Sequence, residues 1–155
     1  MASFVVDTDI ASDILIGDAD LAAALANIQA QGGRVYYSEV TRGELHSWSN
    51  ALAPDCTAAD ALLASADDVL EVDSTISRKA GELRRLSSAV VGQRCATCGS
   101  VTGGKLKLPD AMIAATAITE GAALITRNVA DFQALVAQGI LVVMSGDDLI
   151  AQYKP

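Results

Sequence analysis

Apolar residues occur along the chain in short runs that alternate with helical patterns. The short runs predict strands at about 4–7, 34–37, 69–72, 123–126 and 140–144. Helix starts are expected at Ser12-Asp13 and at 18–20, and Leu21, Leu25 and Ile28 follow at helical spacing. Further helices are predicted over 39–52, 57–66, 74–91, 109–120, 129–137 and 147–152. This alternation predicts an α/β fold of three layers, α/β/α, with a central, mainly parallel sheet.

One segment, at about 92–107, interrupts this pattern. It contains four glycines and two cysteines and has no periodicity, which is typical of a loop or an insertion. The rest of the chain shows no internal repeat and no change of composition that would indicate a linker. Residues 1–155 are therefore expected to form a single domain.

Composition places the chain among globular proteins with an aliphatic core. Hydrophobic residues make up 51% of the 155 residues, and aromatic residues only 4%. No N-terminal signal pattern is present, and no apolar run approaches the roughly 20 residues needed to span a bilayer. A cytoplasmic protein without membrane contact is expected.

Three cysteines, an odd number, do not indicate a disulfide scaffold. Cys95 and Cys98 have the spacing of half a zinc site, and Cys56 or His46 could supply further ligands. Because a second such pair is missing, reduced loop thiols are the favoured interpretation. His46 itself is expected to be a partly buried helical residue rather than a general base.

The net charge of −8 is unevenly distributed. Seven of the 11 basic residues lie between positions 78 and 107, where Glu82 is the only acid. Local phosphate contacts determine affinity for nucleic acid more than total charge does. The charge pattern predicts nucleic-acid contacts at Arg78, Lys79, Arg84, Arg85 and Arg94. The alternative interpretation is an ordinary solvated helical face.

Four acids stand beside apolar segments that are far apart in the sequence: Asp7, Glu44, Asp110 and Asp131. The carboxyl ends of parallel strands meet at one edge of a sheet, so the fold would bring these acids together. Carboxylates collected in this way repel one another unless a hard divalent cation lies between them. With Mg²⁺ or Mn²⁺ bound, such a site could activate water to attack a phosphodiester.

In these same segments, at 7–9, 38–45, 110–117 and 124–132, the sequence resembles the PIN domain family of ribonucleases. It is most similar to the VapC-type toxins of type II toxin-antitoxin systems. The resemblance covers nearly the whole chain. It implies an endoribonuclease that depends on Mg²⁺ or Mn²⁺, with a cognate antitoxin protein as partner and a tendency to form homodimers.

The resemblance also implies roles for individual residues. Asp7, Glu44, Asp110 and Asp131 would be the catalytic, metal-binding acids. Supporting roles would fall to Thr8, Asp9, Thr126 and Asn128. Asp9 stands where many relatives have asparagine, Glu39 adds a further acid, and the segment at 92–107 is longer than is usual before the third acid.

Other interpretations remain open at this point. Taken singly, Asp7 or Asp110 could be a helix cap, and Asp147-Asp148 is expected to cap the last helix. Asp7-Thr8-Asp9 with a late Gly-Asp-Asp would also fit a haloacid dehalogenase-like phosphatase, although that leaves the other acids without a role. A catalytically silent PIN-fold binding module is the non-enzyme alternative.

Overall fold

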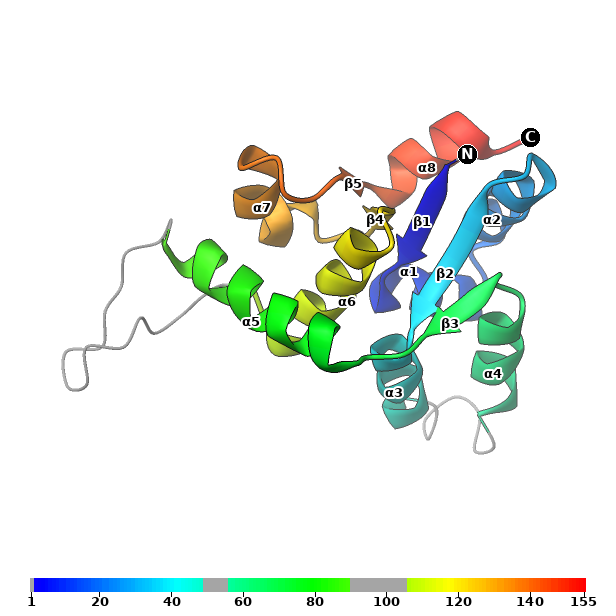
Figure 1. Cartoon of the computed structure of the whole chain (residues 1–155). Coiled ribbons are helices and arrows are strands. Elements are labelled where there is room, and N and C mark those ends of the chain that lie inside the picture. Colours follow the sequence, from blue (N-terminus) through cyan, green and yellow to red (C-terminus); the bar gives the residue numbers. More distant parts are fainter. Residues whose placement is uncertain (1, 49–55, 90–105) are drawn as a thin grey trace.

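The computed structural model describes residues 2–48, 56–89 and 106–155, which form strands alternating with helices (Figure 1). The strands are β1 (Ser3–Val6), β2 (Arg34–Ser38), β3 (Asp68–Leu70), β4 (Ala123–Ile125) and β5 (Val143–Met144). The helices are α1 (Thr8–Leu15), α2 (Ala19–Ala30), α3 (Glu39–Trp48), α4 (Thr57–Ala64), α5 (Ser74–Ala89), α6 (Leu108–Thr119), the 3₁₀ turn η2 (Val129–Phe132), α7 (Gln133–Ala137) and α8 (Gly146–Tyr153). Among the described helices, none is both long and apolar enough to cross a membrane.

The strands form one sheet in the order β3-β2-β1-β4-β5, and every neighbouring pair is parallel. Val5 of the central strand pairs with Tyr36 on one side and with Leu124 on the other. The direction of chain progression reverses between β1 and β4, which is where open parallel sheets usually carry their functional sites. Asp7 continues the ladder at this point, because its backbone N–H donates to the carbonyl of Ile125 at 2.9 Å.

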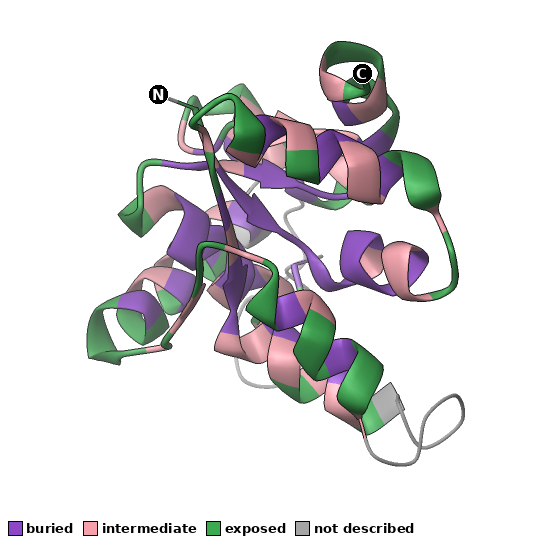
Figure 2. Cartoon of the chain, turned by 90° about the vertical axis from the view of Figure 1, so that its right-hand side faces the viewer, coloured by how far each residue is buried: buried purple, intermediate pink, exposed green. Residues whose placement is uncertain are grey.

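Helices cover both faces of the sheet, so the predicted α/β/α layers and parallel sheet are confirmed. Figure 2 shows the strands as a buried layer between partly exposed helices. Side chains alternate between the two faces: Phe4, Val6 and Ile125 pack in one core cluster, whereas Val5 and Leu124 pack in the other. Helices α1, α2, α4 and α8 contribute to the first cluster, and α5, α6 and α7 to the second.

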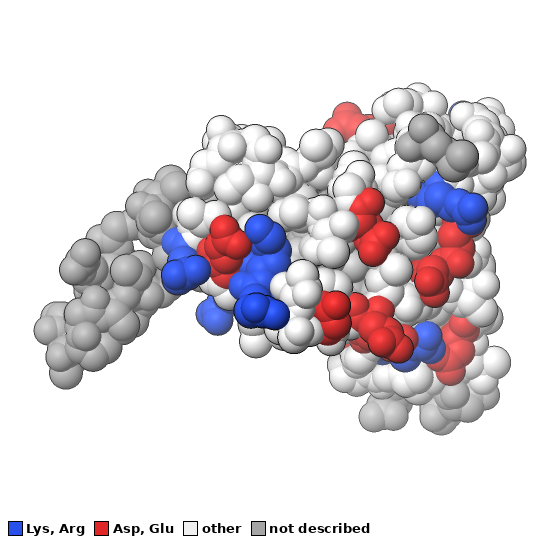
Figure 3. All heavy atoms as spheres, in the orientation of Figure 1, with Lys and Arg blue, Asp and Glu red and all other residues white. Residues whose placement is uncertain are grey.

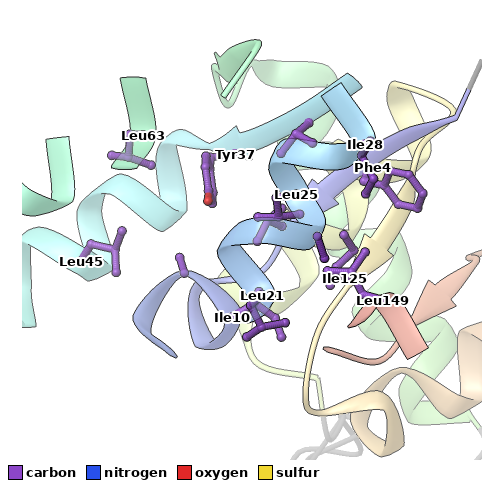
Figure 4. Close-up of a cluster of buried hydrophobic side chains, with 14 of the residues drawn as sticks. Phe4, Ile10, Leu21, Leu25, Ile28, Tyr37, Leu45, Leu63, Ile125 and Leu149 are labelled. Carbon is purple, nitrogen blue, oxygen red and sulfur yellow. The ribbon is translucent and has the colours of Figure 1, made fainter. Parts of the chain in front are cut away.

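Helix α2 shows how the apolar spacing read from the sequence becomes packing. Its Leu21, Leu25 and Ile28 are buried and point into the first cluster (Figure 4). Asp18 caps this helix by accepting hydrogen bonds from the backbone N–H groups of Asp20 and Leu21. The predicted helix start at 18–20 is therefore confirmed.

One predicted helix start and one predicted helix cap are wrong. Helix α1 begins at Thr8, with Asp7 as its cap, and Ser12 lies inside it, where the hydroxyl donates to the Thr8 carbonyl at 2.7 Å. Helix α8 is capped by Ser145 rather than by Asp147-Asp148. The Ser145 hydroxyl accepts from the backbone N–H of Asp148 at 3.0 Å and lies 2.6 Å from its carboxylate, a reciprocal cap.

Other boundaries differ by a few residues. The helix predicted over 129–137 is divided into η2 and α7, and the strand predicted over 140–144 pairs only through Val143–Met144. Leu106 is fully buried at the end of the predicted loop, in the second cluster. Residues 49–52, 90–91 and most of the segment at 92–107 lie outside the described residues.

Candidate functional site

Asp7 lies at the carboxyl end of β1 and is only 5% exposed. One carboxylate oxygen, Oδ1, accepts from the backbone N–H of Thr8 at 2.7 Å. The other, Oδ2, accepts from the Thr126 hydroxyl, which follows β4, at 2.8 Å. Burial raises the pKa of Asp7 to about 7, and the nearby Asp9 charge adds to this effect. Asp7 is thus both the cap of α1 and a buried acid at the reversal point of the sheet.

Asp9 lies beside Asp7 on the first turn of α1 and shares its hydroxyl donor. Its Oδ2 lies 3.2 Å from the Thr126 hydroxyl and accepts from the backbone N–H of Arg127 at 3.0 Å. The Thr126 hydroxyl also accepts from the backbone N–H of Asn128 at 3.1 Å. Since that hydroxyl carries a single hydrogen, it can satisfy only one of the two carboxylates at a time.

Glu44 approaches the same edge of the sheet from α3. Its Oε2 accepts a hydrogen bond from the Thr8 hydroxyl, which also lies 3.3 Å from the Thr41 hydroxyl. Thr8 and Thr41 are both buried. Thr8, which follows Asp7 directly, therefore links the segment of the first acid to Glu44 by a hydrogen bond, although Asp7 and Glu44 are far apart in the sequence.

Asp110 lies in the first turn of α6 and is partly buried. The cap position of α6 belongs to Lys107, so the capping alternative is wrong for Asp110. Its pKa is raised, first by burial and then by the charge of Glu44, while Lys107 opposes the rise. Asp131 and Asp9 also raise it. Asp110 is therefore close enough to the other acids for their charges to interact.

Asp131 lies in η2, just beyond β4, and is exposed. Its backbone N–H donates to the Asn128 carbonyl at 2.9 Å, which closes the turn. Asn128 is exposed and takes part in the site through its backbone, by the bond to Thr126. Phe132, fully buried in the second cluster, anchors this turn to the fold.

The acids share one region, yet within residues 2–48, 56–89 and 106–155 no three histidine, cysteine, aspartate or glutamate side chains are placed closely enough to hold a metal ion. The donor set nevertheless fits a hard cation such as Mg²⁺ or Mn²⁺, because it consists of carboxylates with hydroxyls beside them. In the described part of the chain, no basic side chain forms an ion pair with any of these acids: Asp7, Asp9, Glu44, Asp110 and Asp131. A divalent cation would supply the missing positive charge.

The predicted RNA-binding residues lie mostly on α5. Its inner face, with Ile76, Ala80 and Leu83, is buried against the second cluster and α6. Its outer face carries the basic side chains: Arg78, Lys79, Arg84 and Arg85. Figure 3 shows Lys and Arg gathered over α5, with acidic side chains mainly elsewhere on this face. Arg94 lies outside the described residues.

His46 does not belong to the acid site. Its Nε2 lies 2.9 Å from Asp60 Oδ1, so it links α3 to α4, and its side chain is 39% exposed. The expectation of a partly buried helical histidine is confirmed. The zinc hypothesis stays a prediction, because Cys95 and Cys98 lie outside the described residues.

Three features near the site were not predicted from the sequence: Thr41, Lys107 and the ion pair between Arg127 and Asp13. Arg127 Nε forms a close ion pair with the buried Asp13 carboxylate, which joins the loop after β4 to α1. Thr41 could have been found, because it stands one helical turn before Glu44 on the same face of α3. Lys107 and Arg127 carried no such signal, since their place beside the acids depends on the tertiary fold.

Comparison with solved structures gave several similar folds. A toxin-antitoxin complex from Klebsiella pneumoniae matches with 27% identity and a TM-score of 0.64, over 94% of this chain and 98% of that chain. DNA-bound VapBC from Salmonella typhimurium matches with 19% identity and a TM-score of 0.70, over 94% and 99%. VapBC-5 from Mycobacterium tuberculosis matches with 25% identity and a TM-score of 0.54, over 94% and 98%.

Comparison with curated proteins gave no match. A family model, in contrast, matches most of the chain: the PIN domain model aligns with residues 4–136. The aligned region runs from β1 into α7 and contains the acids of the site: Asp7, Asp9, Glu44, Asp110 and Asp131. The five-stranded parallel sheet and the acids at its reversal point agree with this match. The chain therefore belongs to the PIN domain family.

Proposed function

We propose that this protein is an endoribonuclease that depends on Mg²⁺ or Mn²⁺ and hydrolyses RNA phosphodiesters. The observation that carries the proposal is the set of acids at one edge of the sheet, with Asp7 almost fully buried and without a basic partner among the described residues. A fold keeps such an arrangement at a cost in stability, which a catalytic metal site explains. Asp7, Glu44, Asp110 and Asp131 are the proposed metal-binding and catalytic residues.

Each residue has a distinct task in this proposal. The Thr126 hydroxyl holds the Asp7 carboxylate in place, and Thr8 does the same for Glu44. Asp110 and Asp131 approach from α6 and η2 and complete the acidic edge. When bound, the cation would lower the pKa of a water molecule and offset the negative charge that develops on the phosphate. Asp9 and Asn128 shape the loop that carries Asp131.

The proposed RNA path runs along the outer face of α5 towards Asp110. The Arg84 Nε donates to the carbonyl of Leu106 at 3.3 Å, and Lys107 follows directly in the chain. The charge of Lys107 lowers the pKa of Asp110, so positive charge extends from α5 to the edge of the acid site. Phosphates on either side of the cleaved bond could follow this path.

A toxin role is the finer part of the proposal. The similar structures include toxin-antitoxin complexes, and one of them is 27% identical over 94% of this chain. We infer a VapC-type toxin whose cognate antitoxin covers the acidic site, where a basic side chain of the partner would be attracted. The cytoplasm as location, a homodimer and a single domain over 1–155 stay predictions.

Two other functions fit less well. A haloacid dehalogenase-like phosphatase would use the Gly-Asp-Asp segment late in the chain, but there Asp148 is engaged with the Ser145 cap and Asp147 is exposed on α8. A silent PIN-fold binding module would have no need to keep Asp7 buried without a basic partner among residues 2–48, 56–89 and 106–155. RNA cleavage with and without metal distinguishes this module from a nuclease.

Metal removal gives the direct test. The purified chain is expected to cleave structured RNA with Mg²⁺ or Mn²⁺ and to lose this activity completely with excess EDTA, because the proposed mechanism uses a bound cation to lower the pKa of the attacking water. Cleavage of synthetic stem-loops and of total RNA, followed on denaturing gels, measures this. Adding back Mn²⁺ should restore activity. Cleavage that persists in EDTA would contradict the metal mechanism, and a folded protein that cuts no RNA with either metal would favour the binding module.

The basic face of α5 makes a separate prediction. Reversing the charge of Arg78 and Arg85 together is expected to weaken RNA binding and to flatten its dependence on salt. The slope of log K against log salt should fall by about 0.7 for each phosphate that the protein no longer neutralises. Fluorescence anisotropy with EDTA present measures binding without cleavage. Lys154→Glu, which changes a charge paired with exposed Asp20 on another part of the surface, is the control. An unchanged slope would remove α5 from the RNA path.

A further inference from the structure

Thr41 is a fully buried polar residue that the proposed mechanism does not yet use. It lies on α3 with 0% exposure, three residues before Glu44 and on the same side of the helix. Its hydroxyl oxygen lies 3.3 Å from that of Thr8, which is itself only 7% exposed. Thr8 in turn donates to the Glu44 carboxylate. Three side chains from α1 and α3 therefore form a continuous polar contact at the acid site.

The chemistry of these groups fixes the direction of the hydrogen bonds. An ionised carboxylate can only accept, so the single hydroxyl hydrogen of Thr8 must go to Glu44. The Thr8 oxygen is then left as an acceptor, and Thr41 is the group that can donate to it. The chain of donation runs from Thr41 to Thr8 to Glu44. Each bond in such a chain polarises and strengthens the next.

We propose that Thr41 is a positioning residue of the acid site, which acts through the Thr8 hydroxyl to fix the orientation of the Glu44 carboxylate. This inference rests on the proposed function, because its purpose is to prepare a metal ligand. Thr41 touches neither the cation nor the RNA. It selects one rotamer of Thr8, and Thr8 selects one orientation of Glu44.

The location of the contact supports this role. Thr8 follows Asp7 directly, so the orientation of its hydroxyl is coupled to the acid that ends β1. Glu44 and Asp110 lie on helices that contact each other, since α3 packs against α6. A Glu44 side chain that was free to rotate would not hold one orientation in the site. Hydrogen-bond partners behind metal ligands typically affect metal affinity for the same reason.

A double-mutant cycle tests the proposal on the full chain. Thr41→Val keeps the shape of the side chain but removes the hydroxyl, and Thr8→Val breaks the contact to Glu44 directly. Mn²⁺ affinity without RNA, measured by electron paramagnetic resonance, is the main readout. Thr41→Val is expected to weaken Mn²⁺ binding about threefold to tenfold, and Thr8→Val by about tenfold or more. In the Thr8→Val background, Thr41→Val should cause no further loss.

Thr41→Ser is the matched control, because it retains the hydroxyl and should restore Mn²⁺ affinity to within about twofold of the original protein. Thermal unfolding in EDTA separates positioning from packing. A Thr41→Val protein with unchanged Mn²⁺ affinity, or one whose loss is the same with and without the Thr8 hydroxyl, would overturn the inference. Mn²⁺ binding with an intact cycle but without RNA cleavage would support the positioning role and refute the nuclease. Absence of Mn²⁺ binding in the original protein would overturn both.

Discussion

Replacing Asp110 with asparagine is expected to lower the rate of RNA cleavage by about a thousandfold or more, which corresponds to the several kcal/mol that a metal site contributes to the transition state. Asp110 lies among the other acids, and their charges act on it. An amide in its place cannot supply the negative charge that holds a divalent cation. Single-turnover cleavage of a synthetic stem-loop with saturating Mn²⁺ measures the effect.

The fold of the Asp110→Asn protein should not change, because Asp110 does not cap α6. Glu120→Gln is a matched control: it removes one negative charge from the other end of the same helix, where the side chain is exposed. This control should cleave at the original rate. If both variants lose activity equally, net charge is responsible rather than the acid site. If Asp110→Asn unfolds the protein, the role of the residue is structural.

Replacing Asp7 with asparagine is expected to stabilise the metal-free protein at pH 8. The pKa of Asp7 is raised from 3.8 to about 7 by burial and by Asp9. Keeping the residue ionised in the folded state at pH 8 therefore costs up to about 4 kcal/mol. The amide carries no charge but can no longer accept at both positions now used by Thr8 and Thr126, which reduces the gain to roughly 2–3 kcal/mol. Urea unfolding in EDTA measures this difference.

The pH dependence of stability follows from the same pKa. Asp7 stays protonated in the folded state up to about pH 7, whereas in the unfolded chain it ionises near pH 3.8. Its contribution to the free energy of unfolding is therefore fully present below pH 3.8 and is lost as the pH rises to 7. Asp67 acts in the opposite direction, since its pKa is lowered by the hydrogen bond from the Val35 N–H, but its contribution changes only below its usual pKa. The decline between pH 4 and 7 should therefore be shallower in Asp7→Asn.

Asp147→Asn, a change at an exposed acid of α8, is the control for this experiment and should leave the pH profile unaltered. Metal binding should show the converse behaviour, because protons compete with the cation for Asp7 and affinity should fall as the pH drops below 7. If Asp7→Asn were less stable than the original protein at pH 8 in EDTA, Asp7 would contribute more as a hydrogen-bonded cap than it costs as a buried charge.

Periodicity was sufficient to predict the layers of this fold. Strands at 4–7 and 123–126 are short apolar runs buried on both faces, and such runs are typical of a central parallel sheet. The helix boundaries were less predictable where two residues could both act as cap. Ser12-Asp13 has the composition of a helix start, yet Asp7 lies in extended conformation just before Thr8 and takes that role.

The acids could be anticipated because each follows an element, or lies within its first two turns, at the same edge of the sheet. The contacts that hold these acids in place could not be anticipated from the sequence. The hydrogen bond from Thr126 to Asp7 joins residues 119 positions apart, and it depends on the pairing of β4 with β1. Lys107 and Arg127 likewise gain their place beside the acids only when α6 and the loop after β4 are packed. Sequence spacing carries no information on such contacts.

The hydrogen bond from the Asp7 backbone N–H to the Ile125 carbonyl divides the acid site into two regions that differ in their resistance to local unfolding. Since this bond belongs to the central ladder of the sheet, Asp7 can leave its position only when the strands themselves separate. Asp131 instead is exposed on the 3₁₀ turn η2, outside the sheet, and this turn is anchored in the second cluster by Phe132. Local opening of that turn costs far less than global unfolding. We therefore expect Asp131 to leave its place more readily than Asp7, so that the fourth acid can be lost and regained while the other half of the site remains assembled.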